Sequence, residues 1–192
     1  MHRSVDVEQW SRREAYAFFR DYRQPYFNVC VPLEVGRLVE LSRTAECPFT
    51  LAVLYLVARA ANEYEPFRCR LRDGLPIVHD RIHVGTTLLL EEERLAFAHY
   101  EYRNDFAAFR EAALRVRQGV RAGLEGMNAW EGRTDLLHTS SMPWFAFTGI
   151  THAHRGSDDS VPKLTFGRYQ RGADGAVHMP VAVEVHHAVM DG

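Results

Sequence analysis

The chain has 192 residues, of which 46% are hydrophobic and 25% are charged, and its formal net charge is −2. A chain of this length can bury one sizeable core, so we expect a single domain. The near-neutral charge and the scattered arginines give no sign of a nucleic-acid partner. Three cysteines fit neither a disulfide framework nor a zinc site, which favours a reduced, cytoplasmic setting. No secretory signal opens the chain, and the longest apolar run, 51–58, is too short to span a membrane.

Residue patterns in the first third of the chain predict three helices around one strand. Asp6 and Gln9 resemble a capping box at the start of the first helix, and Pro25 lies beyond its end. The third helix is apolar on nearly every side, so it must be buried. Aromatic and β-branched residues predict the strand. The helices are expected over 7–22, 35–45 and 48–64, and the strand over 26–34.

The remaining chain alternates strands with one helix. Asn104 is expected to cap an amphipathic helix whose apolar stripe, Phe106, Phe109, Ala113, Val116 and Val120, needs a sheet to cover. Strands are expected over 75–79, 84–90, 95–102, 143–150, 161–169 and 177–187. The first three read as an antiparallel meander, and the turn at Asp174-Gly175 joins the last two as a hairpin. The fold class is therefore α/β of the α+β type, a mixed, largely antiparallel β-sheet with helices packed on it.

The end of the chain carries a His-His-x-x-x-Asp-Gly motif, from His186 to Gly192, after an apolar strand. Side chains alternate along a strand, so His186 and His187 point to opposite faces. This argues against a paired metal site and for one working histidine. The Asp-Gly turn places Asp191 on a bend, where it can approach groups that a straight strand would not reach.

The motif resembles the active-site motif of the chloramphenicol acetyltransferase family, and similarity in the same order extends over nearly the whole chain. The segments that carry it are Trp10-Ser11-Arg12-Arg13-Glu14, Glu65-Pro66-Phe67-Arg68, Pro143-Trp144-Phe145-Ala146-Phe147, Thr165-Phe166-Gly167-Arg168-Tyr169 and Met179-Pro180. The resemblance implies a two-layer sandwich and a homotrimer with active sites at the subunit interfaces. It also implies acetyl-CoA as co-substrate, no metal, and acetyl transfer to a hydroxyl of a small acceptor such as chloramphenicol.

The resemblance assigns catalytic roles by position. His187 matches the general base that takes a proton from the acceptor hydroxyl, without an acyl-enzyme intermediate. Asp191 matches the motif aspartate, which pairs with the arginine at Arg12 and has an architectural role. Thr165 matches a threonine that helps to bind the tetrahedral oxyanion through water. Cofactor contacts near the CoA adenosine fall on Arg168 and Tyr169.

The acceptor side shows departures from the family pattern. Acceptor-pocket positions fall on Phe19 and near Leu95. The family serine that donates directly to the oxyanion aligns with Gly149, beside Thr148, and such a donor can be worth about 2.7–4 kcal/mol of barrier. If 143–150 is a strand, alternation aims Thr148 away from the face of Gly149, so it is not expected to replace the serine. Glu184 stands where the family has glutamine.

Three alternatives stay open from the sequence. The catalytic core of dihydrolipoyl acyltransferases shares the terminal motif, although the Trp10-Ser11-Arg12 opening favours the first family. A degenerate homologue that assembles without turnover would also fit Gly149. A metal site from His138, His152 and His154 is disfavoured, because the Gly/Ser/Asp-rich stretch around them is typical of a solvated loop. The domain is expected over residues 1–192 and truncated after the motif, since family members continue with a final helix.

Overall fold

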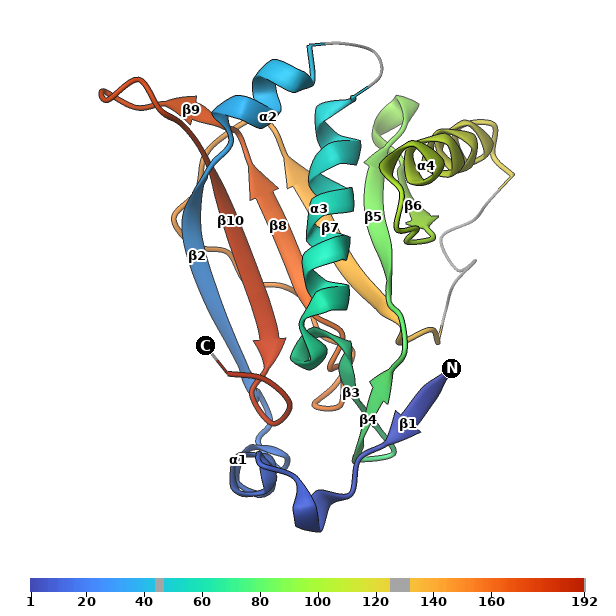
Figure 1. Ribbon diagram of the computed structural model, residues 1–192, viewed down its shortest axis with the longest axis vertical. Helices are drawn as coiled ribbons and strands as arrows, with labels where there is room; N and C mark the ends of the chain where they lie inside the picture. The colour runs from blue at the N-terminus through green and yellow to red at the C-terminus, as the bar shows by residue number, and fades with distance from the viewer. Residues whose placement is uncertain (44–46, 125–131, 192) are drawn as a thin grey trace.

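A mixed β-sheet forms the centre of the computed structural model, which describes residues 1–43, 47–124 and 132–191 (Figure 1). Strands β5 and β7 and strands β7 and β8 pair in parallel, whereas the other pairs are antiparallel. The expected mixed, largely antiparallel sheet is therefore confirmed. In spatial order its strands are β2 (Tyr26–Glu34), β10 (Val177–His186), β8 (Lys163–Gly167), β7 (Leu136–Met142), β5 (His83–Leu89) and β6 (Leu95–Tyr100), with β9 (Gln170–Arg171) beside β10.

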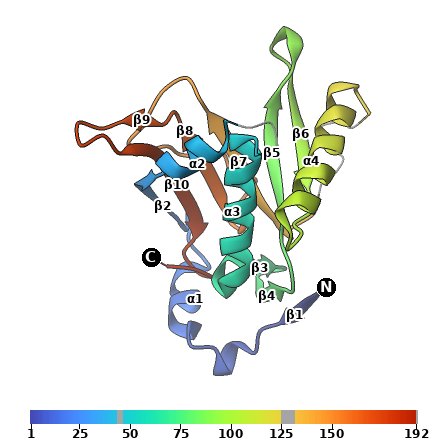
Figure 2. The ribbon, with the colours of Figure 1, turned by 45° about the horizontal axis from the view of Figure 1, so that its top comes forward.

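Helices cover one face of this sheet, as Figures 1 and 2 show. They are α2 (Gly36–Leu41), α3 (Phe49–Glu63) and α4 (Phe106–Arg121). The predicted α3 buries most of its apolar residues, although Leu56 remains 48% exposed. The stripe on α4 is confirmed, because Phe109, Ala113 and Val120 are buried. Its cap is Asp105 and not Asn104, since Asp105 Oδ1 accepts from the backbone N–H of Ala108 at 2.8 Å.

A small antiparallel sheet lies at one end of the molecule. It joins β1 (His2–Ser4), β4 (Leu75–His79) and β3 (Cys69–Arg72), with η2 (Glu65–Arg68) before β3. The expected meander is therefore wrong in part: β5 and β6 form a hairpin around η3 (Glu91–Glu93), but β4 pairs with β1 and β3. A residue pattern predicts that a strand forms but not which strand it pairs with. The partners of β4 could therefore not be predicted from the local sequence.

The N-terminal helix is shorter than expected. A 3-10 turn, η1 (Val7–Gln9), is followed by extended backbone at Trp10, and α1 spans Arg13–Phe19. Asp6 caps η1 by accepting from the N–H of Glu8, which replaces the predicted capping box. The second helix, α2, likewise ends early, at Leu41, and residues 44 and 45 of its predicted range lie outside the described residues.

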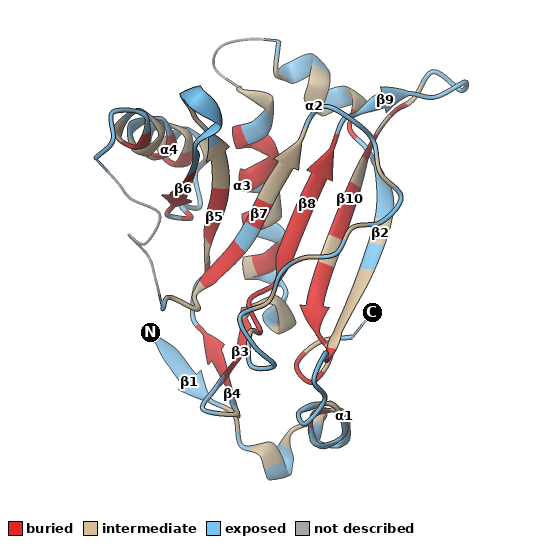
Figure 3. Ribbon diagram, turned by 180° about the vertical axis from the view of Figure 1, so that it is seen from behind, coloured by how far each residue is buried: buried red, intermediate tan, exposed pale blue. Residues whose placement is uncertain are grey.

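Residues 143–162, between β7 and β8, cross the sheet face that the helices leave uncovered (Figure 3). The strand expected over 143–150 is wrong, because β7 ends at Met142. Pro143 follows at once and lacks the N–H that a sheet ladder needs. Thr148 and Gly149 are therefore exposed loop residues, and the argument from strand alternation does not apply to them. The hairpin before β10 is confirmed, with Gly175 at a φ of 82° in its turn.

Candidate functional site

His187 lies one residue beyond the end of β10, inside a small aromatic cluster. Its imidazole stacks on the ring of Phe19, with centroids 3.9 Å apart and planes 7° from parallel. The ring of Phe27 lies 4.8 Å away at a tilt of 51°. The His187 backbone N–H donates to the carbonyl of Pro25 at 2.6 Å. Phe19, expected in the acceptor pocket, thus contacts the imidazole itself and fixes its plane.

Arg12 and Asp191 form the ion pair that the sequence predicts. Arg12 Nη1 lies 2.7 Å from Asp191 Oδ2, and Arg12 Nη2 donates to the carbonyl oxygen of His187 at 3.1 Å. The hydrogen bond from Arg12 holds the pKa of Asp191 below its usual range. One planar guanidinium therefore ties the turn at Asp191 to the main chain of His187.

His186 points the other way, as the alternation of side chains predicts. Its side chain is 1% exposed. Its Nδ1 accepts from the N–H of Ala188 at 3.2 Å, so Nε2 carries the proton of the neutral ring and donates to the carbonyl of Ser157 at 2.8 Å. Burial lowers the pKa of His186 and keeps the ring neutral. Both nitrogens are occupied, so His186 has a structural role.

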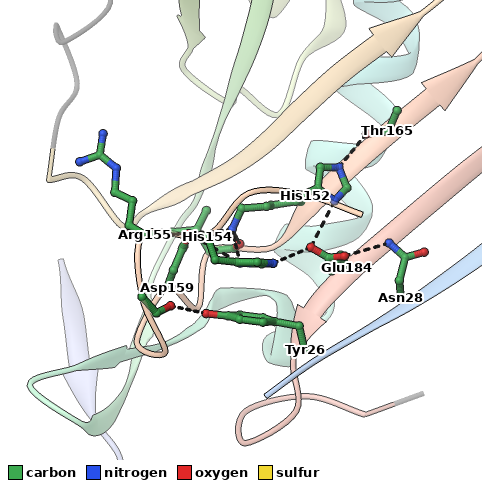
Figure 4. A network of polar contacts seen from close by, with 11 residues as sticks. Tyr26, Asn28, His152, His154, Arg155, Asp159, Thr165 and Glu184 are labelled. Atoms are coloured by element: carbon green, nitrogen blue, oxygen red, sulfur yellow. Dashed lines mark hydrogen bonds and ion pairs between the residues drawn. The ribbon is translucent and has the colours of Figure 1, made fainter. Parts of the chain in front are cut away.

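A polar cluster lies on the helix-free face, near the C-terminal end of β10 (Figure 4). Its centre is the carboxylate of Glu184, which is only 5% exposed. It contacts His154 Nε2 at 2.8 Å, His152 Nδ1 at 3.2 Å and Asn28 Nδ2 at 3.3 Å. His152 Nε2 lies 2.8 Å from Thr165 Oγ1. The interpretation of this stretch as a solvated loop holds for 155–158, which are exposed and form neither helix nor strand, but not for His152 and His154, whose side chains are only 15% and 18% exposed.

An ion pair between Lys163 and Asp159 completes the cluster. Lys163 Nζ contacts Asp159 Oδ2 at 2.8 Å and His154 Nδ1 at 3.2 Å. Burial alone would raise the pKa of Asp159, but the hydrogen bond and the charge of Lys163, together with the N–H of Arg155, outweigh it, and the pKa lies below its usual range. The third histidine of the metal hypothesis, His138, is an exposed residue of β7. Within the described ranges, no group of three or more His, Cys, Asp or Glu side chains is arranged to hold a metal ion.

The sheet register explains how the cluster is assembled. One row of directly paired residues on the helix-free face crosses the sheet from β2 to β6, through every strand except β9, and carries polar groups on five of its six strands. Glu184 and Lys163 are neighbours in this row, on β10 and β8, and the two histidines reach them from the crossing segment. In strand order the row is Asn28, Glu184, Lys163, His138, Gly85 and His99.

The residues expected to bind the co-substrate lie beside a cavity of about 380 Å³. Arg168 and Tyr169 follow β8, and the ring of Tyr169 lies 5.2 Å from that of Phe49 on α3. Leu95 lies elsewhere, at the start of β6, and its side chain is 57% exposed.

Among the described helices, none is long and apolar enough to cross a membrane.

The chain by itself does not bring all the expected residues together. Thr165 is paired with Ala182, five residues before His187. At about 3.3 Å per residue this separates Thr165 from His187 by about 16 Å along β10. Arg168 and Tyr169 are farther still, because β8 runs antiparallel to β10. The structure thus unites Arg12, Phe19, His187 and Asp191 at one end of β10 and leaves the other predicted positions in separate places.

Comparisons with known proteins agree with the motif. The family model of chloramphenicol acetyltransferase matches residues 1–192. Chloramphenicol acetyltransferases of Escherichia coli and Klebsiella sp are 29% identical over 194 residues, which are 98% of this chain and 86% of theirs. Chloramphenicol acetyltransferase 2 of Escherichia coli is 29% identical over 190 residues, 98% of this chain and 89% of its own.

Solved structures show the same relationship. A chloramphenicol acetyltransferase matches with a TM-score of 0.88 and 28% identity, covering 100% of this chain and 93% of that one. Dihydrolipoamide acetyltransferase of Azotobacter vinelandii matches with a TM-score of 0.67 and 17% identity, covering 93% and 79%, which shows a shared fold alone. Because the family model covers the whole sequence, this chain belongs to the chloramphenicol acetyltransferase family and is an acyltransferase.

Proposed function

We propose that this protein transfers the acetyl group of acetyl-CoA to a hydroxyl of a small acceptor such as chloramphenicol, with His187 as the general base. His187 removes the hydroxyl proton while the acceptor oxygen attacks the thioester carbonyl. The new C–O bond forms, the C–S bond breaks, and the CoA thiolate leaves and takes up a proton. General-base assistance of this kind contributes about 10²–10⁴-fold.

The observation that carries this proposal is the way His187 is held. Phe19 stacks on the imidazole, and Arg12 binds both the His187 carbonyl and Asp191. The buried Nδ1 has no hydrogen-bond partner among the described residues. The ring and the main chain of His187 are both held in place, and among the described residues no carboxylate bonds to Nδ1. A histidine held in this way suits proton transfer better than a structural role.

We propose a homotrimer whose active sites lie between subunits. The separation of Thr165 from His187 within one chain supports this arrangement, because a second copy must supply the missing half of the site. The cavity beside Arg168 and Tyr169 is the place where we expect the adenosine of CoA. The cationic guanidinium suits a phosphate-bearing ligand, and the tyrosine ring suits a base.

The decisive experiment is a panel of small hydroxyl-bearing acceptors, including chloramphenicol, read by CoA release from acetyl-CoA. We expect release that depends on the acceptor and is abolished by His187→Ala. A dithiol acceptor of the dihydrolipoyl type serves as the comparison. Faster turnover of the dithiol, or no turnover with any hydroxyl compound, would overturn the proposal.

Gly149 offers a separate test of the acceptor side. An ideal Cβ built on Gly149 meets no atom within 4 Å, so a side chain fits there. If the direct oxyanion donor has been lost, Gly149→Ser should raise kcat, by less than the roughly 10²–10³-fold of a fully aligned donor. Gly149→Ala is the matched control that fills the same space without a hydroxyl.

Thr148 is the competing donor, and its substitution decides the matter. If the oxyanion donor has been lost and not replaced, Thr148→Ala should leave kcat nearly unchanged. A sharp fall in kcat for Thr148→Ala, together with no gain for Gly149→Ser, would show that Thr148 has taken over the role. Steady-state rates with one turned-over acceptor are sufficient for all three variants.

A further inference from the structure

The exposed residues Thr148 and Gly149 lie between two points where the crossing segment is fixed to the sheet. The first point precedes them. The backbone N–H of Arg168 donates to the carbonyl of Phe145 at 2.9 Å. The ring of Phe147 lies so close to Gly167 that a Cβ there would come within 3.0 Å of it. The position of Thr148 and Gly149 therefore depends also on where the segment is fixed after them.

The second point is His152, three residues after Gly149. Its imidazole joins Thr165 on β8 to Glu184 on β10, so it contacts two neighbouring strands at once. Thr165 is fully enclosed, with 0% exposure. Its hydroxyl therefore meets His152 and is shielded from bulk solvent.

The protons of the cluster can be assigned from its contacts. The ammonium of Lys163 has only protons to offer, so His154 Nδ1 accepts and His154 Nε2 donates to Glu184. Burial lowers the pKa of His152, which favours the neutral ring. His152 Nδ1 then donates to the Glu184 carboxylate, and Nε2 accepts the proton of the Thr165 hydroxyl. Each bond has one direction, which fixes the ring.

We propose that His152, held by Glu184, is a positioning residue for acetyl transfer that acts through the Thr165 hydroxyl and sets the place of Thr148 and Gly149. The inference rests on the proposed function, in which those two residues border the acceptor. A misplacement of about 1 Å at a reacting group can cost about 10²-fold in rate. Releasing the segment at His152 removes the fixed point that follows Gly149 by three residues.

The first test compares His152→Ala with His154→Ala. Both changes remove a hydrogen bond to Glu184, but only His152 contacts Thr165. We expect His152→Ala to lower kcat/KM for the acceptor by about 10–100-fold, with the KM for acetyl-CoA within about twofold. His154→Ala should stay within about threefold of the unmodified protein. Equal losses in the two variants, at similar thermal stability, would overturn the proposal.

The second test asks whether His152 acts through the hydroxyl. Thr165→Val removes the hydroxyl at nearly constant shape and should reproduce the loss, whereas Thr165→Ser should restore the activity. Adding His152→Ala to Thr165→Val should lower kcat/KM little further, because both changes break the same hydrogen bond, between His152 and Thr165. The inference would be refuted if the losses of the two single variants multiplied in the double variant, or if Thr165→Ser were as slow as Thr165→Val. If His152→Ala fails to fold, the Thr165 pair alone decides.

His187→Ala in the same series separates the two levels of the argument. An inactive His187→Ala beside a fully active Thr165→Val would refute the positioning role of His152 and leave the proposed function intact. An active His187→Ala would refute the proposed function itself. The readout throughout is CoA release at varied acceptor, with circular dichroism as the check on folding.

Discussion

His187→Ala is expected to lower kcat for acetyl transfer by about 10²–10⁴-fold, because the acceptor hydroxyl then loses its proton to water and not to a positioned imidazole. The variant should remain folded. The imidazole contributes ring contacts with Phe19 and Phe27, and the hydrogen bonds at this residue that involve Pro25 and Arg12 are made by its main chain. The measurement is CoA release at saturating acetyl-CoA, with the far-ultraviolet circular dichroism recorded beside it.

The adjacent histidine provides the control. His186→Ala removes a buried ring and leaves the carbonyl of Ser157 and the N–H of Ala188 without their partner. A buried group left unsatisfied costs about 1–3 kcal/mol, so Tm should fall while the folded fraction keeps part of its activity. Complete and equal loss of activity from both substitutions, in proteins of unchanged Tm, would contradict the assignment of His187.

Elements with a strong periodic pattern and clear boundaries could be predicted from the sequence. The strand over 26–34 matches β2 in full, and the apolar stripe of α4 identified its buried face. The strand expected over 143–150 failed because apolar composition was read without weighing Pro143 and Gly149, both poor strand residues. The partner of β4 could not be found, since strand pairing depends on contacts distant in the sequence.

The candidate site, too, could be predicted only in part from the sequence. The terminal motif and the early arginine identified His187, Asp191 and Arg12, and the structure brings the three together. His152 was considered only as a metal ligand, and its contacts with the sheet were missed. Its two partners lie 13 and 32 residues away, on two different strands. A histidine in a Gly/Ser/Asp-rich stretch looks solvated until the sheet register places Glu184 beneath it. The departure from glutamine at Glu184 was the one available signal.

The pair of Arg12 and Asp191 should behave as one unit. Arg12→Ala and Asp191→Ala are each expected to lower kcat by about 10–100-fold, because either change frees the turn that follows His187. The double substitution should cost little more than either single one. For the free energy of unfolding, their interaction should fall in the lower part of the roughly 0.5–3 kcal/mol range, since the Asp191 side chain is 55% exposed. Simple additivity in both kcat and Tm would remove the proposed unit.

Two further variants show which property of the pair matters. Arg12→Lys keeps the charge but loses the planar fork that reaches both the Asp191 carboxylate and the His187 carbonyl, so it should recover little activity. Asp191→Asn removes the charge. The pKa of Asp191 is depressed in the folded protein, so its contribution to stability is present above the usual aspartate pKa and is lost as pH falls through the folded value. The Tm difference between the unmodified protein and Asp191→Asn should therefore be largest near neutral pH and shrink in acid. A difference that stays constant with pH would mean that Asp191 acts by shape and not by charge.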